Sequence, residues 1–258
     1  MIRIAAVGDV HVGSDSAGAL REHLASVPDR ADLLLLAGDL TKSGEPSEAE
    51  VLCAELQGLR VQVVAVLGNH DHHGDQPERI ADMLREVGVA VLEGDAVEVG
   101  TPSGTVGIAG VKGFGGGFAG ANGTEFGEPE MKAFVRHAKE RADALEGALA
   151  SLRTPVRVGL MHYSPVRETL QGEPPEIFPF LGSFLLAEAI DRAGADLAIH
   201  GHAHRGVEHG VTPGGVHVRN VAQSVIRQGY AVYTFAGDGA QMSQPGRAGE
   251  VPARPGPN

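Results

Sequence analysis

The sequence predicts an α/β protein whose first part forms a largely parallel β-sheet. Short apolar runs alternate with segments of helical periodicity between residues 2 and 87. Consecutive strands that are separated by helices run parallel, because each helix carries the chain back to the same edge of the sheet. Strands are expected at residues 2–7, 33–37 and 61–67, and helices at 17–27, 48–59 and 77–87.

The remainder of the chain predicts further strands around one long helix. Short runs separated by turns indicate antiparallel strands at 89–92, 96–99 and 105–109. Later elements are a charged amphipathic helix at 128–152, a helix at 183–193, and strands at 156–161, 196–200, 216–221 and 230–235. We expect a single domain over residues 1–239. A Pro-, Gly- and Arg-rich tail at 240–258 is expected to be disordered.

Two segments are expected to be loops. The glycine-rich stretch 113–127 lacks the Gly-Lys-Ser/Thr ending of a P-loop, so it is either a lid over a site or a surface loop. The Pro- and Gly-rich stretch 164–181 forms the second loop. Both could supply the walls of a substrate pocket.

Composition restricts the class of protein. The chain has 258 residues, 42% of them hydrophobic, and a formal net charge of −12. This negative charge makes nucleic acid an unlikely partner, because phosphate backbones are repelled over long range. The sole cysteine, Cys53, excludes an intrachain disulfide and is expected to face the core. No signal peptide or membrane span is recognisable, so we expect a cytoplasmic protein.

Five short polar blocks each follow an expected strand. They are Asp9-Val10-His11, Gly38-Asp39, Gly68-Asn69-His70-Asp71, His162, and Gly201-His202-Ala203-His204. Strand ends of an open α/β sheet converge on one edge, where ligands bind. Taken singly, each block has a plainer interpretation as a turn, a helix cap or a packed histidine. Five blocks in this arrangement favour a shared site.

The residue types in the blocks indicate divalent metal ions. Carboxylates together with imidazoles favour manganese, iron or zinc over calcium, and the absence of cysteine from the blocks excludes a zinc finger. Two such ions about 3.5–4 Å apart clamp a phosphate oxygen and lower the pKa of bound water. The blocks therefore predict a two-metal phosphoesterase.

The same blocks resemble the calcineurin-like metallophosphoesterase superfamily, whose pattern they match in order from Asp9 to His204. The resemblance implies a four-layer αββα sandwich of mixed sheets flanked by helices. It implies one metal held by Asp9, His11, Asp39 and His204, and a second held by Asp39, Asn69, His162 and His202. It further implies that His70 donates a proton to the leaving oxygen and that Asp71 orients His70.

The resemblance also narrows the substrate class. The second block continues Leu40-Thr41-Lys42-Ser43-Gly44, without the arginine of Ser/Thr protein phosphatases, and Asp71 resembles the phosphodiesterase branch. We expect a hydrolase that cleaves phosphodiesters or small phosphomonoesters, including cyclic nucleotides, by attack of a metal-bridging hydroxide. A nuclease and a non-catalytic scaffold of the same fold are the alternatives. Arg167 and Arg205 lie near the blocks in the sequence and are candidate contacts for the phosphate of a substrate. The sequence leaves open whether the protein forms a homo-oligomer.

Overall fold

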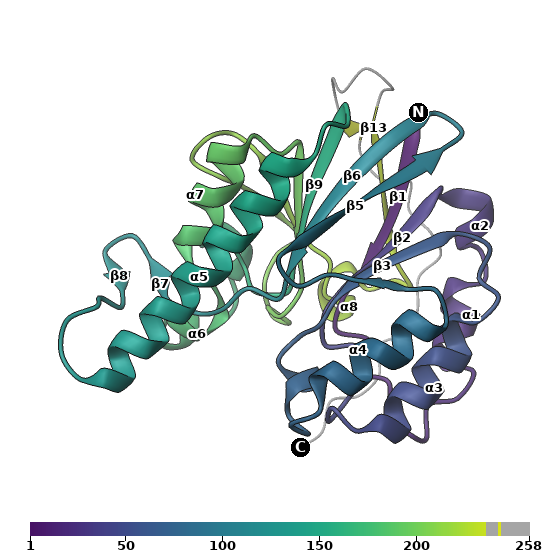
Figure 1. Cartoon of the computed structure of the whole chain (residues 1–258), viewed down its shortest axis with the longest axis horizontal. Helices are drawn as coiled ribbons and strands as arrows, with labels where there is room; N and C mark the ends of the chain where they lie inside the picture. The colour runs from purple at the N-terminus through teal and green to yellow at the C-terminus, as the bar shows by residue number, and fades with distance from the viewer. Residues whose placement is uncertain (236–241, 244–258) are drawn as a thin grey trace.

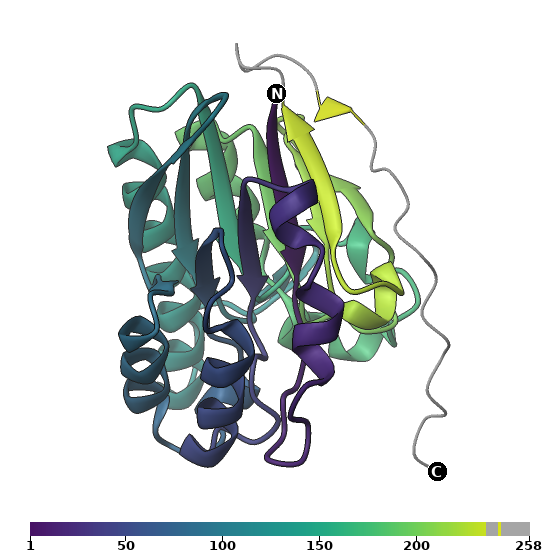
Figure 2. The same cartoon turned by 90° about the vertical axis from the view of Figure 1, so that its right-hand side faces the viewer.

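Two six-stranded β-sheets face each other in the computed structural model, which describes residues 1–235 and 242–243 (Figures 1 and 2). Helices cover the outer face of each sheet, which gives four layers in the order helix, sheet, sheet, helix. The expected αββα sandwich is therefore confirmed. Each sheet mixes parallel and antiparallel pairs, and the parallel strands form its centre.

The first sheet is built mainly from the N-terminal part of the chain. Its order is β14–β13–β1–β2–β3–β4, and the last four of these strands are parallel to one another. On the other side of β1, β13 pairs antiparallel with β1, and β14 pairs antiparallel with β13. The strands are β1 (Ile2–Val7), β2 (Leu33–Ala37), β3 (Gln62–Val66), β4 (Ala90–Val91), β13 (Ala231–Phe235) and β14 (Met242–Ser243).

The second sheet has the order β11–β12–β10–β9–β6–β5. Its four central strands are parallel, and an antiparallel strand lies at each edge. The strands are β5 (Asp95–Thr101), β6 (Gly104–Val111), β9 (Val156–Met161), β10 (Leu197–His200), β11 (His209–Val211) and β12 (His217–Asn220).

The outer helices divide between the two sheets. Helices α1 to α4 pack on the first sheet, and α5 and α7 pack side by side on the second (Figure 1). They are α1 (Ala19–Leu24), α2 (Val27–Arg30), α3 (Pro46–Leu56), α4 (Pro77–Glu86), α5 (Pro129–Ser151) and α7 (Phe184–Ala193). No helix in the described part of the chain is long and apolar enough to cross a membrane.

Strand β2 shows why its sequence is apolar at every position. Its side chains alternate in direction, as in any strand. Leu34 and Leu36 enter the cluster under the helices, whereas Leu33 and Leu35 enter the cluster between the sheets. All four are fully buried, because a central strand of a four-layer fold has no face in contact with water.

Several expected elements lie in a different arrangement. The antiparallel pairing of β5 with β6 is confirmed, but β4 joins the first sheet parallel to β3. The glycine-rich loop contains a small hairpin of β7 (Gly117–Phe118) and β8 (Ala121–Asn122), and the second loop contains α6 (Phe178–Leu181). Elements this short carry too few residues to show a period in the sequence.

Of the C-terminal segment 240–258, which was expected to be disordered, the structure describes two residues. β14 pairs antiparallel with β13 through its two residues, 242 and 243. The rest of the segment 240–258 lies outside the described residues, so its expected disorder stays a prediction, as does the boundary of the domain at residue 239.

Replacing Leu35 by Ala tests the core between the sheets. Leu35 is fully buried there, so we expect the free energy of unfolding to fall by about 2–5 kcal/mol, the range for a buried Leu-to-Ala change. Urea unfolding followed by circular dichroism measures the loss. The control is Ile177→Ala at a 38% exposed position, which should change stability by less than about 0.5 kcal/mol. Equal effects of both changes would contradict this packing.

Candidate metal centre

The five polar blocks meet at one edge of the sandwich. Blocks one to three follow the carboxyl ends of β1, β2 and β3 in the first sheet, and blocks four and five follow β9 and β10 in the second. Parallel strands point their carboxyl ends the same way, so the blocks of each sheet gather at the same end. The two sheets thus contribute to a common site.

The first group of candidate ligands combines Asp9, His11, Asp39 and His204, whose possible ligand atoms all lie within 4.8 Å of one another. His204 Nε2 is 2.8 Å from Asp9 Oδ1. His11 Nε2 is 3.8 Å from Asp39 Oδ2, and it is buried without a hydrogen-bond partner among the described residues. A buried nitrogen lone pair that faces a carboxylate is the arrangement expected beside a cation site.

The second group shares Asp39 with the first. Asp39, His162 and His202 place their ligand atoms within 4.8 Å of one another. His162 Nε2 lies 3.2 Å from Asp39 Oδ1 and 2.9 Å from Asn69 Oδ1. The structure therefore brings together all seven residues expected to be ligands, and Asp39 belongs to both groups.

Backbone carbonyls fix the tautomers of two histidines. Ala37 O accepts a hydrogen bond from His162 Nδ1 over 2.9 Å, so the proton stays on Nδ1 and Nε2 keeps a lone pair. Phe180 O lies 3.2 Å from His202 Nε2, which in the same way leaves Nδ1 of His202 as the lone-pair nitrogen. Carbonyl partners of this kind orient metal-binding histidines in proteins.

Burial keeps most of these histidines neutral. It lowers the pKa of His11 to about 4 and that of His202 to about 3, and it holds the pKa of His162 well below its usual range. His204 differs, because the hydrogen bond to Asp9 raises its pKa. Metal binding requires neutral imidazoles, and three of these four histidines have lowered pKa values that keep them neutral near pH 7.

Burial also acts on the carboxylates. Asp9 and Asp39 are 6% and 1% exposed, and burial raises the pKa of Asp9 to about 6, against the hydrogen bond from His204. The charge of Asp39 raises it further. Two buried carboxylates and several nitrogen lone pairs facing one space suit divalent cations, so the residues fit the metal pair implied by the family.

Unusual backbone conformations concentrate in the blocks. Six non-glycine residues in the described part of the chain have positive φ, and four of them are Asp9 (58°), His11 (43°), Asp39 (49°) and His202 (70°). Each such residue costs on the order of 1 kcal/mol or more. The surrounding fold sustains that strain at the ligands.

Two glycines make room for ligand side chains. A Cβ on Gly38 would lie 2.5 Å from Nδ1 of His162, and φ of Gly38 is +80°. A Cβ on Gly68 would collide with Oδ1 and the backbone nitrogen of Asp39. Glycine precedes the ligand in both blocks because any larger residue would occupy the space of another ligand.

His70 lies beside the ligands with one ring nitrogen held in place. Its Nδ1 is 2.7 Å from Lys42 O, and its Nε2 is 3.9 Å from Asp39 Oδ2. The ring contacts the ring of His11, with 4.5 Å between centroids. The side chain is 43% exposed, so Nε2 faces the ligands from the solvent side.

Asp71 acts by a different route from the one expected. Instead of contacting His70, its buried carboxylate accepts hydrogen bonds from the backbone of Leu40, Thr41 and Gly68 and from the Thr41 hydroxyl, at 2.6–3.1 Å. Burial raises its pKa to about 6. Asp71 thus fixes the loop that carries Asp39 and Lys42, and the Lys42 carbonyl in turn orients His70.

The two arginine candidates show no contact with the ligands. Arg167 is exposed, and its guanidinium lies 5.5 Å from the Phe178 ring centroid. Arg205 is also exposed, and its backbone N–H donates to Glu173 over 2.7 Å. A role in substrate binding stays a prediction for both.

One neighbour of the site was not predicted. Lys112 follows β6, and its carbonyl accepts hydrogen bonds from the backbone N–H groups of His162 and Tyr163. Burial lowers the pKa of its ammonium. The signal available was its position: Lys112 ends a strand that points toward the same edge, but it has no place in the family pattern.

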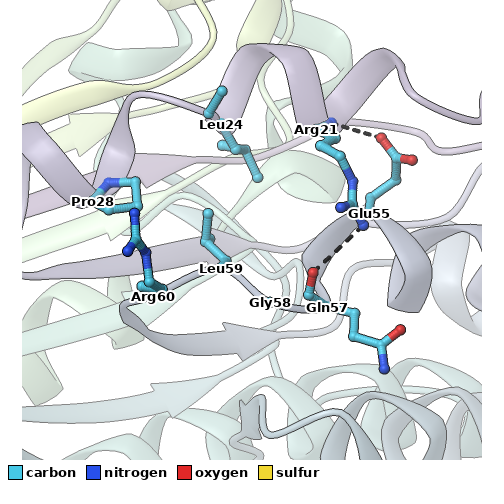
Figure 3. A pocket seen from close by; sticks show the side chains of 9 residues that line it. Arg21, Leu24, Pro28, Glu55, Gln57, Gly58, Leu59 and Arg60 are labelled. Atoms are coloured by element: carbon cyan, nitrogen blue, oxygen red, sulfur yellow. Dashed lines mark hydrogen bonds between the residues drawn. The ribbon is translucent and has the colours of Figure 1, made fainter.

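A shallow pocket also lies away from the blocks, between α1, α2 and the end of α3 (Figure 3). Two of its charged side chains are engaged within the fold, and one of them is Glu55, which accepts hydrogen bonds from the backbone of Gly18 and Arg21. The Arg21 guanidinium donates to the Ala54 carbonyl. The described residues that line the pocket contain no cluster of His, Asp and Glu that could hold a metal ion, in contrast to the five blocks.

Comparison with known proteins agrees with this geometry. The sequence pattern of the calcineurin-like phosphoesterases matches residues 2–206. The chain belongs to this family. All five blocks lie within the matched residues, and members of this family are typically metal-dependent hydrolases.

Individual proteins match this chain less completely, or at lower sequence identity, than the family pattern does. The chain is 34% identical over 92 residues to a probable cyclic nucleotide phosphodiesterase of Synechococcus sp., a match that spans 32% of this chain and 34% of the relative. The Phosphopantetheinyl Hydrolase of Mycobacterium tuberculosis has a similar fold, with a TM-score of 0.63, 18% identity, and coverage of 86% of this chain and 89% of that one. GAP50, the anchor in the inner membrane complex of Plasmodium, is also similar in fold. Its TM-score is 0.56 at 10% identity, and the match covers 90% of this chain and 80% of that one.

Replacing Gly68 by Ala tests the close approach of Asp39. We expect the added methyl group to displace Asp39, to lower the melting temperature, and to reduce bound manganese to less than one ion per chain. Elemental analysis after gel filtration and thermal denaturation give the two readouts. The control is Gly147→Ala in α5, where a Cβ meets no atom within 4 Å. Full manganese content in the Gly68 variant would refute the steric argument.

Replacing Asp39 by Asn tests the electrostatic argument. Without metal, the variant should melt at or above the temperature of the unmodified protein, because one of two buried like charges is gone. Manganese at 100 times its Kd should stabilise the unmodified protein by about 2.7 kcal/mol per site and the variant far less. Thermal denaturation with and without manganese measures both. Asp143→Asn on the exposed face of α5 is the control. An equal manganese response in all three proteins would contradict the assignment.

Proposed function

We propose that this phosphoesterase is a two-metal hydrolase of small phosphodiesters and phosphomonoesters, with cyclic nucleotides among its candidate substrates. The observation that carries the proposal is the position of Asp39, which belongs to both ligand groups and can therefore bridge two ions. The name of the Synechococcus relative supports the cyclic nucleotide as a candidate. Manganese, iron and zinc all suit the ligand set.

Each residue of the site has a defined task in this proposal. Asp9, His11, Asp39, Asn69, His162, His202 and His204 hold the ions. Two bound divalent ions supply a water of lowered pKa and offset the negative charge of the phosphate. His70 donates a proton from Nε2 to the leaving oxygen, while its Nδ1–H stays bonded to Lys42 O.

The surroundings favour a small substrate over nucleic acid or phosphoprotein. The net charge of −12 opposes long polyanions, which disfavours the nuclease alternative. The second block lacks the arginine of protein phosphatases. A cytoplasmic location is a further prediction that accompanies the proposal, whereas the proposal leaves the oligomeric state open.

Replacing His70 by Ala separates catalysis from metal binding. Loss of the proton donor should lower kcat for bis-p-nitrophenyl phosphate about 10²–10⁴-fold, while the manganese content stays that of the unmodified protein. Release of p-nitrophenolate and elemental analysis measure the two effects. His217→Ala is the matched control, because His217 lies at the amino end of β12. β12 is parallel to β10, so this position is at the end of the sheet opposite to the candidate ligands. Unchanged turnover in the His70 variant would remove the proton-donor role.

A substrate panel decides among the remaining functions. With added manganese, we expect the purified protein to hydrolyse cyclic nucleotides, nucleotide monoesters or artificial diesters, and to leave plasmid and oligonucleotide DNA uncut. Cleavage of DNA alone would establish the nuclease. Less than one divalent ion per chain together with no hydrolysis would instead support a non-catalytic scaffold.

A further inference from the structure

Lys112 stands at the same sheet edge as the ligands but is not one of them. β6 runs parallel to β9, and Val111 is paired with Met161, so Lys112 follows β6 where His162 follows β9. Hydrogen bonds of 3.0 and 3.1 Å from the N–H groups of His162 and Tyr163 to Lys112 O tie the two chain segments together. The backbone of Lys112 is thus held in a fixed position against a metal ligand.

The side chain of Lys112 is largely buried and lies against two aromatic rings. The residue is 8% exposed, and its Nζ lies 5.3 Å from the ring centroid of Phe114 and 5.5 Å from that of Tyr163. These rings attract the cation but cannot accept its three hydrogen bonds in the way that oxygen atoms do.

No anion of the described chain pairs with this ammonium group. Glu93 is the nearby carboxylate, but one oxygen accepts the backbone N–H of Lys112 over 2.9 Å and the other pairs with Arg141 over 2.9 Å. Among the residues described, no carboxylate oxygen lies within 4.0 Å of Lys112 Nζ. The ammonium group thus has no carboxylate partner among the described residues, so it can pair with an anion that arrives with a ligand.

The position of the ammonium relative to the metal centre sets the part of the substrate it would meet. The Tyr163 ring contacts Lys112 on one hand and the ring of His202 on the other, with 4.4 Å between the two ring centroids. Lys112 and the candidate ligand His202 thus share the Tyr163 ring as a neighbour. The scissile phosphate would be held by ions at the candidate ligands, which would leave the ammonium for another anionic group of the same molecule.

We propose that Lys112 binds a second phosphate group of the substrate, distinct from the scissile phosphate. The inference rests on the proposed function, because the metal pair fixes the scissile phosphate. Among the phosphoesters of the proposed function, it predicts a preference for those that carry a further terminal phosphate. A phosphate accepts charge-assisted hydrogen bonds from an ammonium group, which are stronger than those between neutral groups.

A matched pair of chromogenic diesters tests the proposal. Thymidine 5′-(p-nitrophenyl phosphate) and its 3′-phosphorylated form share the scissile bond and differ only in the second phosphate. We expect the manganese-loaded protein to prefer the 3′-phosphorylated form by about tenfold or more in kcat/KM, mainly through KM. Lys112→Met should abolish the preference and Lys112→Arg should retain part of it. Lys139→Met on exposed α5 is the control for charge and should keep the preference.

Binding measurements separate this inference from the proposed function. Isothermal titration of the manganese-loaded protein with thymidine 3′,5′-bisphosphate and with thymidine 5′-monophosphate needs no turnover. Tighter binding of the bisphosphate that is lost in Lys112→Met would support the inference, even if neither diester were hydrolysed. Equal binding of the two nucleotides by the unmodified protein would overturn it. A loss in Lys112→Met that is the same for both nucleotides, or a lower melting temperature alone, would overturn it as well.

Discussion

The structure of the site depends on the burial of two carboxylates next to each other. Asp9 and Asp39 are both almost inaccessible to water, and the charge of Asp39 makes ionisation of Asp9 harder. Such a pair is unfavourable in an apolar interior unless positive charge compensates it. Residues with positive φ carry these oxygens, the glycines leave room for the candidate ligands, and the neutral histidines add lone pairs to the same space.

Much of the fold and of the site follows from the sequence, because both depend on local patterns. The apolar run at β2 predicts a strand buried on both faces, and the blocks predict ligands because they end such strands. The sequence did not predict that β4 pairs with β3 or that β6 pairs with β9. Strand partners depend on packing between residues that are far apart in the sequence. Lys112 was missed for the same reason.

The role of Asp71 shows a similar limit. Its position directly after His70 suggests a direct hydrogen bond, and the sequence contains nothing against it. In the structure the 3₁₀ turn at His70–His72 directs the carboxylate under the neighbouring loop, where three backbone N–H groups and one hydroxyl are available. A fully buried carboxylate requires such donors, so this position is favoured over the half-exposed imidazole.

Both ligand groups draw on both sheets. Asp9, Asp39 and Asn69 come from the first sheet, whereas His162, His202 and His204 come from the second. An ion in either position would therefore act as a cross-link between the sheets, comparable to a disulfide in the length of chain it closes. Closing loops as long as that from residue 9 to residue 204 restricts the unfolded chain most. The sheets would then separate in a single cooperative step.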